Sequence, residues 1–432
     1  MAAAVDGATT VSDWRRALDL VQQRHPLLSA RIERNGENRP CFSQDLAAPI
    51  PLRVVQGTNV TQRWEFQAGL ELSIPFDPTK APLLRAVLLH EEQRAVCLVV
   101  IHHAVADGRS VAFVFRDLLQ ALSGKPVKRL PLIPSFEDTL GITSNDSGYV
   151  GAKNEPASSP IERRRVLVKE QTLPGIRTLS LTTDMTSRLR ERAREEGTTV
   201  HGALSSAFAL ACWEVVEELR DSPIRMLSPI DARKSSGLGE DCALLVGSGT
   251  VSIGPGEATT FWEIARAATT PLRSAQTLAA IRAARHGMFQ VIKQGVDVST
   301  VADIAAQRLA NDIVLTNLGD LGYPTDFGKL QLKAVWGPIG GAKVCGRTHD
   351  WHHYNQWIAA ARTNDLCASR IAARDRRGDV DLRLCDQKAR YGPASYRVIP
   401  QKHGIGHFAP IFQGETGCSE IEKRILGRSR SR

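Results

Sequence analysis

A short apolar run that ends on two adjacent histidines constrains this chain of 432 residues more than any other feature. The run, Val96–Ile101, is uninterrupted and rich in β-branched residues, which favours a buried strand. Downstream, apolar residues recur at helical spacing and predict a helix with one buried face: Val111, Val114, Phe115, Leu118, Leu119 and Leu122. The residues between, His102–Gly108, therefore join a strand to a helix.

Two adjacent imidazoles leave that strand. Because neighbouring residues of a strand point to opposite sides, we expect one of His102 and His103 to face a cavity and the other to pack inward. An imidazole has a pKa near neutrality and is suited to moving a proton. A lone histidine is more often a satisfied core residue, so the assignment depends on the neighbouring segments.

An aspartate and a glycine follow the histidines. We expect Asp107 to shape the site, by binding local backbone N–H groups or an arginine, rather than to transfer protons. A buried carboxylate needs a charged partner, and the sequence leaves Arg85, Arg109 and Arg233 open. We expect Gly108 to be a backbone requirement of a tight turn.

Periodicity and turn residues predict the other elements. We expect helices over 11–29, 110–122 (with Ser110 as its cap), 183–196 and 199–219, and one or more within 261–294. We expect strands over 51–55, 94–101, 224–230, 244–253, 312–318 and 330–335. This pattern alone indicates α plus β structure in two lobes.

The residues His102–Gly108 match the HHxxxDG motif of the chloramphenicol acetyltransferase-like and condensation-domain superfamily. The chain resembles its mycobacterial, polyketide-associated branch most, the phthiocerol/phthiodiolone dimycocerosyl transferase type. Further segments resemble the superfamily in the same order: Ala17–Leu28, Pro75–Ala86, Gly197–Leu204, Ser228–Arg233, Leu315–Gly319 and Asp326–Gly328. In the last of these, Lys329 and Leu330 replace the end of the DFGWG signature of the plant branch.

The resemblance implies an α/β (α+β) fold of two lobes, each a mixed sheet with helices, and a channel between the lobes. We place the N-terminal lobe at 1–140, a crossover linker at 141–172, the C-terminal lobe at 173–342 and an atypical basic tail at 343–432. The linker is rich in Ser, Asn, Gly and Pro, which is typical of a flexible connection.

The resemblance also implies acyl transfer from a thioester, an acyl-CoA or an acyl chain on a carrier protein of a polyketide synthase, to a hydroxyl group. His103 would be the general base, His102 a positioning residue, and Asp107 and Gly108 structural members of the motif. No cofactor beyond the thioester donor is implied. An amide-forming, condensation-type enzyme with an amine acceptor and a degenerate, non-catalytic relative stay open.

Three residues outside the motif are candidate substrate-binding residues: Asn317, Gly319 and Arg233. An amide donor at Asn317 could bind a developing oxyanion. A plain turn at the end of a strand explains Asn317 and Gly319 equally well, and this alternative stays open.

The chain departs from the family pattern at both ends. Only about ten residues precede the first helix, so we expect an edge strand to be missing. The tail 343–432 has 17 basic and nine acidic residues and no sustained apolar period, so we expect it to be poorly packed, disordered or the product of a shifted reading frame. Its Cys345, His349, His352 and His353 match no common zinc spacing, so we predict no metal.

Charge and composition exclude several partners. The net charge of +9 comes almost entirely from the tail, because the rest of the chain has 38 basic and 37 acidic residues, and we expect no nucleic-acid partner. No window approaches about 18 uninterrupted apolar residues, and the first residues do not resemble a signal peptide. The eight cysteines form no CxxC pair. We therefore expect a cytoplasmic protein with free thiols and no membrane span.

Overall fold

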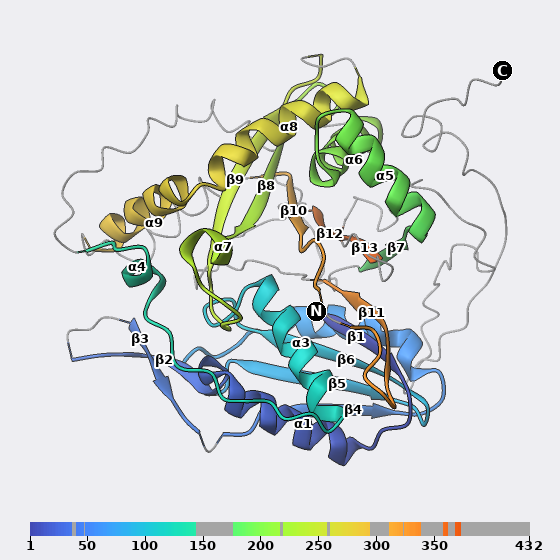
Figure 1. Cartoon of the computed structure of the whole chain (residues 1–432), viewed down its shortest axis with the longest axis vertical. Coiled ribbons are helices and arrows are strands. Elements are labelled where there is room, and N and C mark those ends of the chain that lie inside the picture. Colours follow the sequence, from blue (N-terminus) through green and yellow to red (C-terminus); the bar gives the residue numbers. More distant parts are fainter. Residues whose placement is uncertain are drawn as a thin grey trace, which may run out of the picture.

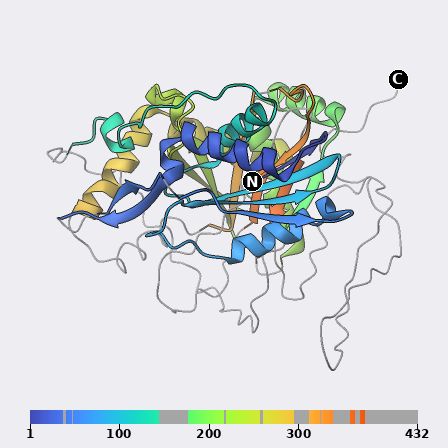
Figure 2. The same ribbon diagram turned by 90° about the horizontal axis from the view of Figure 1, so that it is seen from below.

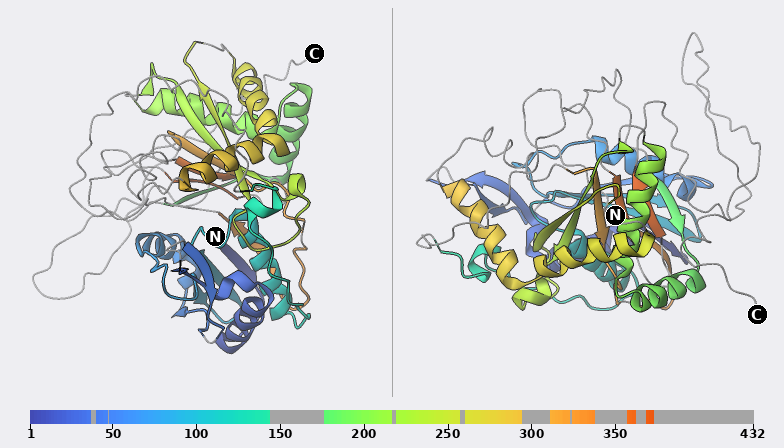
Figure 3. Two further views of the ribbon diagram at one scale, coloured as in Figure 1. Left: turned by 90° about the vertical axis from the view of Figure 1, so that its left-hand side faces the viewer. Right: turned by 90° about the horizontal axis from the view of Figure 1, so that it is seen from above.

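The computed structural model describes residues 1–36, 40–46, 48–143, 176–216, 219–256, 260–293, 311–322, 324–337, 357–361 and 368–372. These residues form two lobes that lie one above the other, and each lobe is built on its own β-sheet (Figure 1; Figure 3, left). Both sheets contain parallel and antiparallel strand pairs. The predicted α/β (α+β) fold of two lobes, each a mixed sheet with helices, is confirmed.

The sheet of the first lobe has five strands. Their order is β11 (Gln331–Trp336), β1 (Ala2–Asp6), β6 (Arg94–Ile101), β5 (Leu84–His90) and β4 (Leu52–Gln56). The β4–β5 pair is parallel, and the other pairs are antiparallel. The predicted strand 94–101 is confirmed as β6, the middle strand of this sheet.

Both faces of β6 are covered by helices, which explains its unbroken apolar run. Helices α1 (Val11–Arg24) and α3 (Gly108–Leu122) lie on one face, and α2 (Trp64–Ser73) lies on the other (Figure 2). Cys97 and Val99 pack with the first pair of helices, whereas Val96 and Leu98 pack with α2. The short 3₁₀ helix Val60–Arg63 leads into α2.

The sequence analysis expected an edge strand to be missing before the first helix, but a strand is present there, and it does not lie at the edge of the sheet. Strand β1 lies between β11 and β6, and Ala3 is in register with Cys97 on one side and Val335 on the other. The prediction was wrong because the few residues before the first helix are enough for a strand of five residues, Ala2–Asp6. Here the ladders of two neighbouring strands supply the backbone hydrogen bonds, and Val5 is buried in the core.

The sheet of the second lobe has six strands. Their order is β7 (Arg177–Ser180), β13 (Ala368–Ala372), β12 (Trp357–Ala361), β10 (Ile313–Asn317), β8 (Ile224–Asp231) and β9 (Val246–Ile253). The lobe's helices are α5 (Thr183–Glu195), α6 (Val200–Val215), α8 (Phe261–Ala275) and α9 (Leu278–Lys293). Side chains of α6 and α8 form a core with β8, β9 and β10.

Two short segments of the tail 343–432 form strands of the second sheet, so the expectation of poor packing does not hold for these two segments. Strands β12 and β13 lie inside the second sheet, where β12 is parallel to β10 and β13 is antiparallel to β7. The other tail residues, including Cys345, His349, His352 and His353, lie outside the described residues. So do residues 144–175, which hold most of the predicted crossover linker.

The two lobes exchange segments across the predicted boundaries. Strand β11 belongs to the first sheet, and Phe327 before it is fully buried in the first core, so 173–342 is not one lobe. In the other direction, Phe136 of α4 (Phe136–Thr139) packs with Ile230 and Leu245 of the second lobe. These crossings fix one lobe against the other, and periodicity alone does not reveal them.

Short elements complete the described chain. The helix predicted over 11–29 ends at Arg24, because Pro26 disfavours helical geometry in the residue before it, and a 3₁₀ helix, Pro26–Ser29, follows. Strands β2 (Ala30–Arg34) and β3 (Pro40–Gln44) form a hairpin. Helix α7 (Arg233–Ser236) follows β8. Of the helices described, none is long and apolar enough to cross a membrane.

A histidine of α6 whose ring contacts β8 predicts that the stability of the fold is sensitive to acid. Burial lowers the pKa of His201 to about 4, and its Nε2 lies 2.8 Å from the Ser228 hydroxyl. The folded pKa is below the ordinary value of 6.5, so stability is complete above pH 6.5 and is lost as the pH falls towards 4. We expect this loss to reach about 3 kcal/mol more in the wild type than in His201→Gln. Urea unfolding at pH 7 and pH 4 measures it, and equal losses in the two proteins would contradict the assignment.

Candidate active site

The histidines lie in a short loop that joins β6 to α3. His102 N–H donates to the Leu83 carbonyl at 2.9 Å, which ends the strand, and Val105 N–H donates to the His102 carbonyl at 3.1 Å. Asp107 is then the N-cap of α3, and its side chain accepts a hydrogen bond from Ser110 N–H. The prediction that Ser110 caps this helix was wrong by one turn, because the cap lies three residues before it.

Gly108 does not form the tight turn that the sequence analysis expected. It is the first residue of α3, a position with helical φ and ψ. The turn lies earlier, at residues 103–105, where Val105 N–H donates to the His102 carbonyl, and Asp107 has an extended backbone with φ of −104° and ψ of −179°. The need for glycine at this position therefore does not arise from a left-handed conformation.

His103 is the more exposed of the two motif histidines. Its side chain is exposed, and Nδ1 lies 2.8 Å from the carbonyl oxygen of Ala106. A carbonyl oxygen only accepts hydrogen bonds, so Nδ1 must carry the proton. In the neutral ring this leaves Nε2 unprotonated, with a lone pair that can accept a proton.

His102 has the opposite tautomer and a more enclosed position. Its Nδ1 accepts a hydrogen bond from Ala104 N–H at 3.2 Å, which leaves the proton on Nε2. The ring of Phe76 meets it edge-on, with centroids 5.9 Å apart. Burial lowers the pKa of His102, and the neighbouring His103 lowers it further. A neutral ring that orders the loop fits the predicted positioning role.

Arg85, one of the three candidate partners of Asp107, lies elsewhere. Its guanidinium carbon is 4.2 Å from the ring centre of Phe76, and Nε donates to Glu71 at 2.6 Å. Burial raises the pKa of Glu71, but hydrogen bonds from Arg53 and Arg85 outweigh it and hold the pKa below its ordinary value. Arg85 therefore supports the ring that contacts His102.

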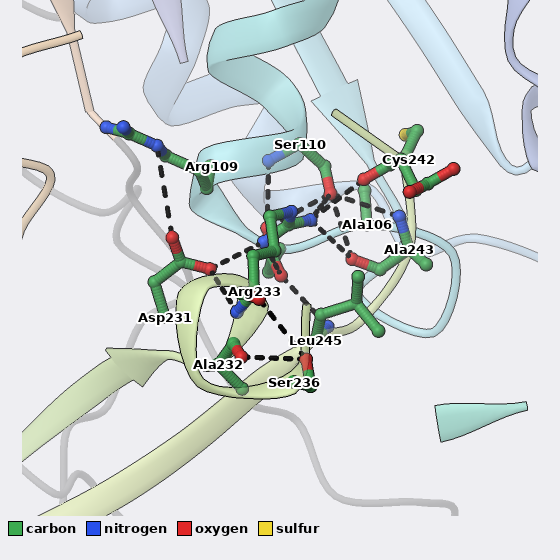
Figure 4. Close-up of polar contacts among 12 residues, drawn as sticks. Ala106, Arg109, Ser110, Asp231, Ala232, Arg233, Ser236, Cys242, Ala243 and Leu245 are labelled. Carbon is green, nitrogen blue, oxygen red and sulfur yellow. Dashed lines mark hydrogen bonds and ion pairs between the residues drawn. The ribbon is translucent and has the colours of Figure 1, made fainter. Parts of the chain in front are cut away.

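Asp107 is bonded at both carboxylate oxygens (Figure 4 shows the surrounding cluster). Its Oδ1 accepts from Ser110 N–H at 2.8 Å, and its Oδ2 accepts from Arg233 Nη1 and Leu245 N–H, both at 2.9 Å. Arg233 and Leu245 belong to the second lobe. Of the three arginines that the sequence left open, Arg233 is thus the partner.

Arg233 is buried among protein groups. Besides Asp107, its guanidinium donates to Asp231 Oδ1 at 2.9 Å, to the Ser110 hydroxyl at 2.8 Å and to the Asp241 carbonyl at 2.9 Å. Burial lowers its pKa, but Asp107 and Asp231 outweigh this effect and raise the pKa above its ordinary value. These contacts describe a structural residue, and none of them supports the predicted substrate-binding role.

The turn after β10 contains the other two candidate substrate-binding residues. Asn317 Oδ1 accepts from Gly319 N–H at 2.8 Å, and Gly319 has a φ of +61°, where a side chain would be strained. The strand-end turn is therefore present. The Nδ2 group of Asn317 remains as a donor, and its role towards substrate stays a prediction.

A second cluster of charges was missed by the sequence analysis. Asp117, on the buried face of α3, bonds Arg24, His25 and Arg116 in the first lobe, and Glu240 of the second lobe bonds both arginines. Burial raises the pKa of Asp117, but the hydrogen bond from His25 and the charge of Arg116 hold it below its ordinary value. A single carboxylate inside an apolar helical face was the signal for it.

Across the residues that the structure describes, no group of three or more His, Cys, Asp or Glu side chains is placed to hold a metal ion.

Two family models match consecutive parts of the chain. The condensation domain matches residues 2–139, and the C-terminal part of phthiocerol/phthiodiolone dimycocerosyl transferase matches residues 170–336. The first part of the chain is thus similar to condensation domains, and the second part is similar to the C-terminal part of phthiocerol/phthiodiolone dimycocerosyl transferase. The resemblance predicted from the motif and its flanking segments is confirmed.

The curated relatives are much longer proteins. The chain is 28% identical over 235 residues to a component of the linear gramicidin synthase of Brevibacillus parabrevis, covering 48% of this chain and 3% of that protein. It is 35% identical over 127 residues to chondramide synthase of Chondromyces crocatus, covering 28% of this chain and 3% of that one. The chain thus spans only a few per cent of their length.

Solved structures show the same fold at low identity. Polyketide synthase associated protein 5 from Mycobacterium tuberculosis matches with a TM-score of 0.58 and 17% identity, covering 87% of this chain and 89% of that one. The first condensation domain of the CDA synthetase matches with a TM-score of 0.56 and 12% identity, covering 86% and 84%.

We expect a large loss of stability when the Asp107–Arg233 ion pair between the lobes is broken. Arg233→Met leaves Asp107 buried without its charged partner, and we expect the free energy of unfolding to fall by about 3–5 kcal/mol. Asp107→Asn combined with Arg233→Met should lose less than the sum of the single losses, because no uncompensated charge remains. Urea unfolding of the four proteins measures this coupling, and additive losses would show that the pair is not coupled.

Proposed function

We propose that the chain transfers an acyl group from a thioester donor to a hydroxyl acceptor, with His103 as general base. The observation that carries this proposal is the hydrogen bond between His103 Nδ1 and the Ala106 carbonyl. It holds the exposed ring with Nε2 unprotonated and therefore ready to accept a proton.

The proposed reaction needs no covalent enzyme intermediate. Nε2 of His103 takes the proton of the acceptor hydroxyl while the oxygen attacks the thioester carbonyl. The tetrahedral intermediate collapses, the carbon–sulfur bond breaks, and the imidazolium returns the proton to the leaving thiolate. Binding both substrates beside one base converts a bimolecular encounter into an oriented reaction.

The family matches support a thioester donor and leave its carrier open. The condensation-domain match and the likeness to a polyketide synthase associated protein support a carrier-bound donor, and acyl-CoA has the same thioester chemistry. We propose that the chain needs no cofactor besides this donor. The predicted channel between the lobes is part of this proposal.

The acceptor distinguishes two candidate functions. The C-terminal match to a transferase named for phthiocerol favours a hydroxyl acceptor and an ester product. The condensation-domain match favours an amine acceptor and an amide product as the second candidate. Both use the same base on the same thioester, so the products separate them.

Replacing the base should lower turnover strongly without unfolding the protein. We expect His103→Ala to lower kcat by about 10² to 10⁴, the usual contribution of a general base. Release of free thiol from a panel of acyl thioesters measures it. His90→Ala is the matched control, because His90 is also a first-lobe histidine, bonded to Thr9. Full activity in a His103→Ala variant that melts cooperatively would contradict the proposal. Absence of any cooperative transition in the wild-type chain would favour a degenerate relative.

Paired acceptors should reveal the product class. With one thioester and matched alcohols and amines of equal chain length, we expect ester masses to accumulate faster than amide masses. Mass spectrometry of the products measures both rates, and each must disappear in His103→Ala. Faster amide formation would assign the chain to the condensation-type alternative.

A further inference from the structure

We propose that Arg109 is a positioning residue that fixes the turn after β10, residues 317–320, against the start of α3. The inference rests on the proposed function and deepens it. It names the group that sets the second-lobe part of the site relative to the loop that carries His103.

Arg109 joins the two lobes directly. It is the second residue of α3, six positions after His103, and its Nη1 donates to the carbonyl oxygens of Leu318 at 2.9 Å and Asp320 at 3.2 Å. Both carbonyls belong to the turn that follows a strand of the second sheet. One side chain of the motif helix thus bonds two successive points of the turn.

The guanidinium of Arg109 is oriented from its other side by Asp231. Its Nε lies 4.0 Å from Asp231 Oδ2, while Asp231 Oδ1 accepts from Arg233 Nη1 at 2.9 Å (Figure 4). Phe113, one helical turn further along α3, has its ring centre 5.8 Å from Arg109 and 5.6 Å from Arg233. Asp231 and Phe113 therefore hold both arginines, one facing Asp107 and one facing the turn.

The turn that Arg109 holds has its own internal lock. Asn317 Oδ1 accepts from Gly319 N–H, so the side-chain amide is oriented by the turn itself. If the turn moves, the Nδ2 donor of Asn317 moves with it. A donor aimed at a developing oxyanion acts only where its geometry is held, and a misplacement of about 1 Å can cost about 100-fold in rate.

An arginine meets this geometry better than a lysine. The planar guanidinium presents Nη1 to the carbonyls and Nε to Asp231 at the same time. An ammonium group is a single point of charge and can serve the carbonyls or Asp231, but not both with the same fixed orientation. Arg109→Lys should therefore retain part of the function that Arg109→Ala loses.

The experiment is a double-mutant cycle on the full chain with a thioester donor and an alcohol acceptor. We expect Arg109→Ala to lower kcat by roughly 10- to 100-fold and to change KM by less than about threefold, as expected for a misplaced transition-state donor. Asn317→Ala should lower kcat similarly, and the double variant should be no worse than the single ones, because Arg109 acts through the turn. The midpoint of the pH–rate profile should not move. Arg109→Lys should fall between wild type and Arg109→Ala.

A matched control separates this role from general structural support. Arg282 is also an arginine that bonds a backbone carbonyl, that of Gly141, at 2.9 Å, and lies outside the site. We expect Arg282→Ala to keep the wild-type kcat, and its effect to add to that of Asn317→Ala. Where Arg109→Ala does not fold, Arg109→Lys takes its place in the cycle.

Three results would overturn the inference: wild-type kcat in Arg109→Ala, wild-type kcat in Asn317→Ala, or additive effects in the double variant. A melting temperature that falls with unchanged kcat would show a structural role only. His103→Ala, assayed alongside, separates the two proposals. If it stays active, the proposed function fails and takes this inference with it. If it is inactive while Arg109→Ala is fully active, only the inference fails.

Discussion

The buried ion pair between Asp107 and Arg233 is the constraint on which the site depends. It connects the cap of the motif helix to the first residue of α7, just after β8, and Leu245 N–H donates to the same carboxylate from the segment before β9. A buried ion pair is weak evidence for stability, because desolvation offsets the attraction between the charges. Its value here is geometric: it fixes the first lobe against the second at the point where the His103 loop ends. Further along α3, the Arg116–Glu240 pair adds a second contact, between α3 and the segment that joins α7 to β9.

Much of this arrangement could be predicted from local sequence. The unbroken apolar run gave the two-sided strand β6, and the helical spacing after it gave the buried face of α3. The motif with its flanking segments gave the superfamily, and Arg233 was among three candidate partners of Asp107. The strand and the helix were predicted correctly because they rest on periodicity within one segment, and the superfamily resemblance held because several segments match in the same order.

Some failures are local, such as the cap of α3 and the tight turn expected at Gly108, and the others involve contacts between distant segments. The alanines of β1 carry no strand signal of their own, and they form a strand because β6 and β11 flank them. Strand β11 follows β10 in sequence but joins the other sheet. The choice among Arg85, Arg109 and Arg233 required the fold, since each arginine has a carboxylate nearby: Glu71 for Arg85, Asp231 for Arg109 and Asp107 for Arg233.

The central claim is that the Ala106 carbonyl fixes His103 as the Nδ1–H tautomer, with Nε2 free to accept a proton. The most direct test is the pair of ¹⁵N chemical shifts of the His103 ring in selectively labelled protein. They are measured at a pH at which the ring is neutral, and the signals are assigned by comparison with His103→Gln. The account predicts a protonated-type shift for Nδ1 and an unprotonated-type shift for Nε2. The reverse pattern, with the proton on Nε2, would contradict it.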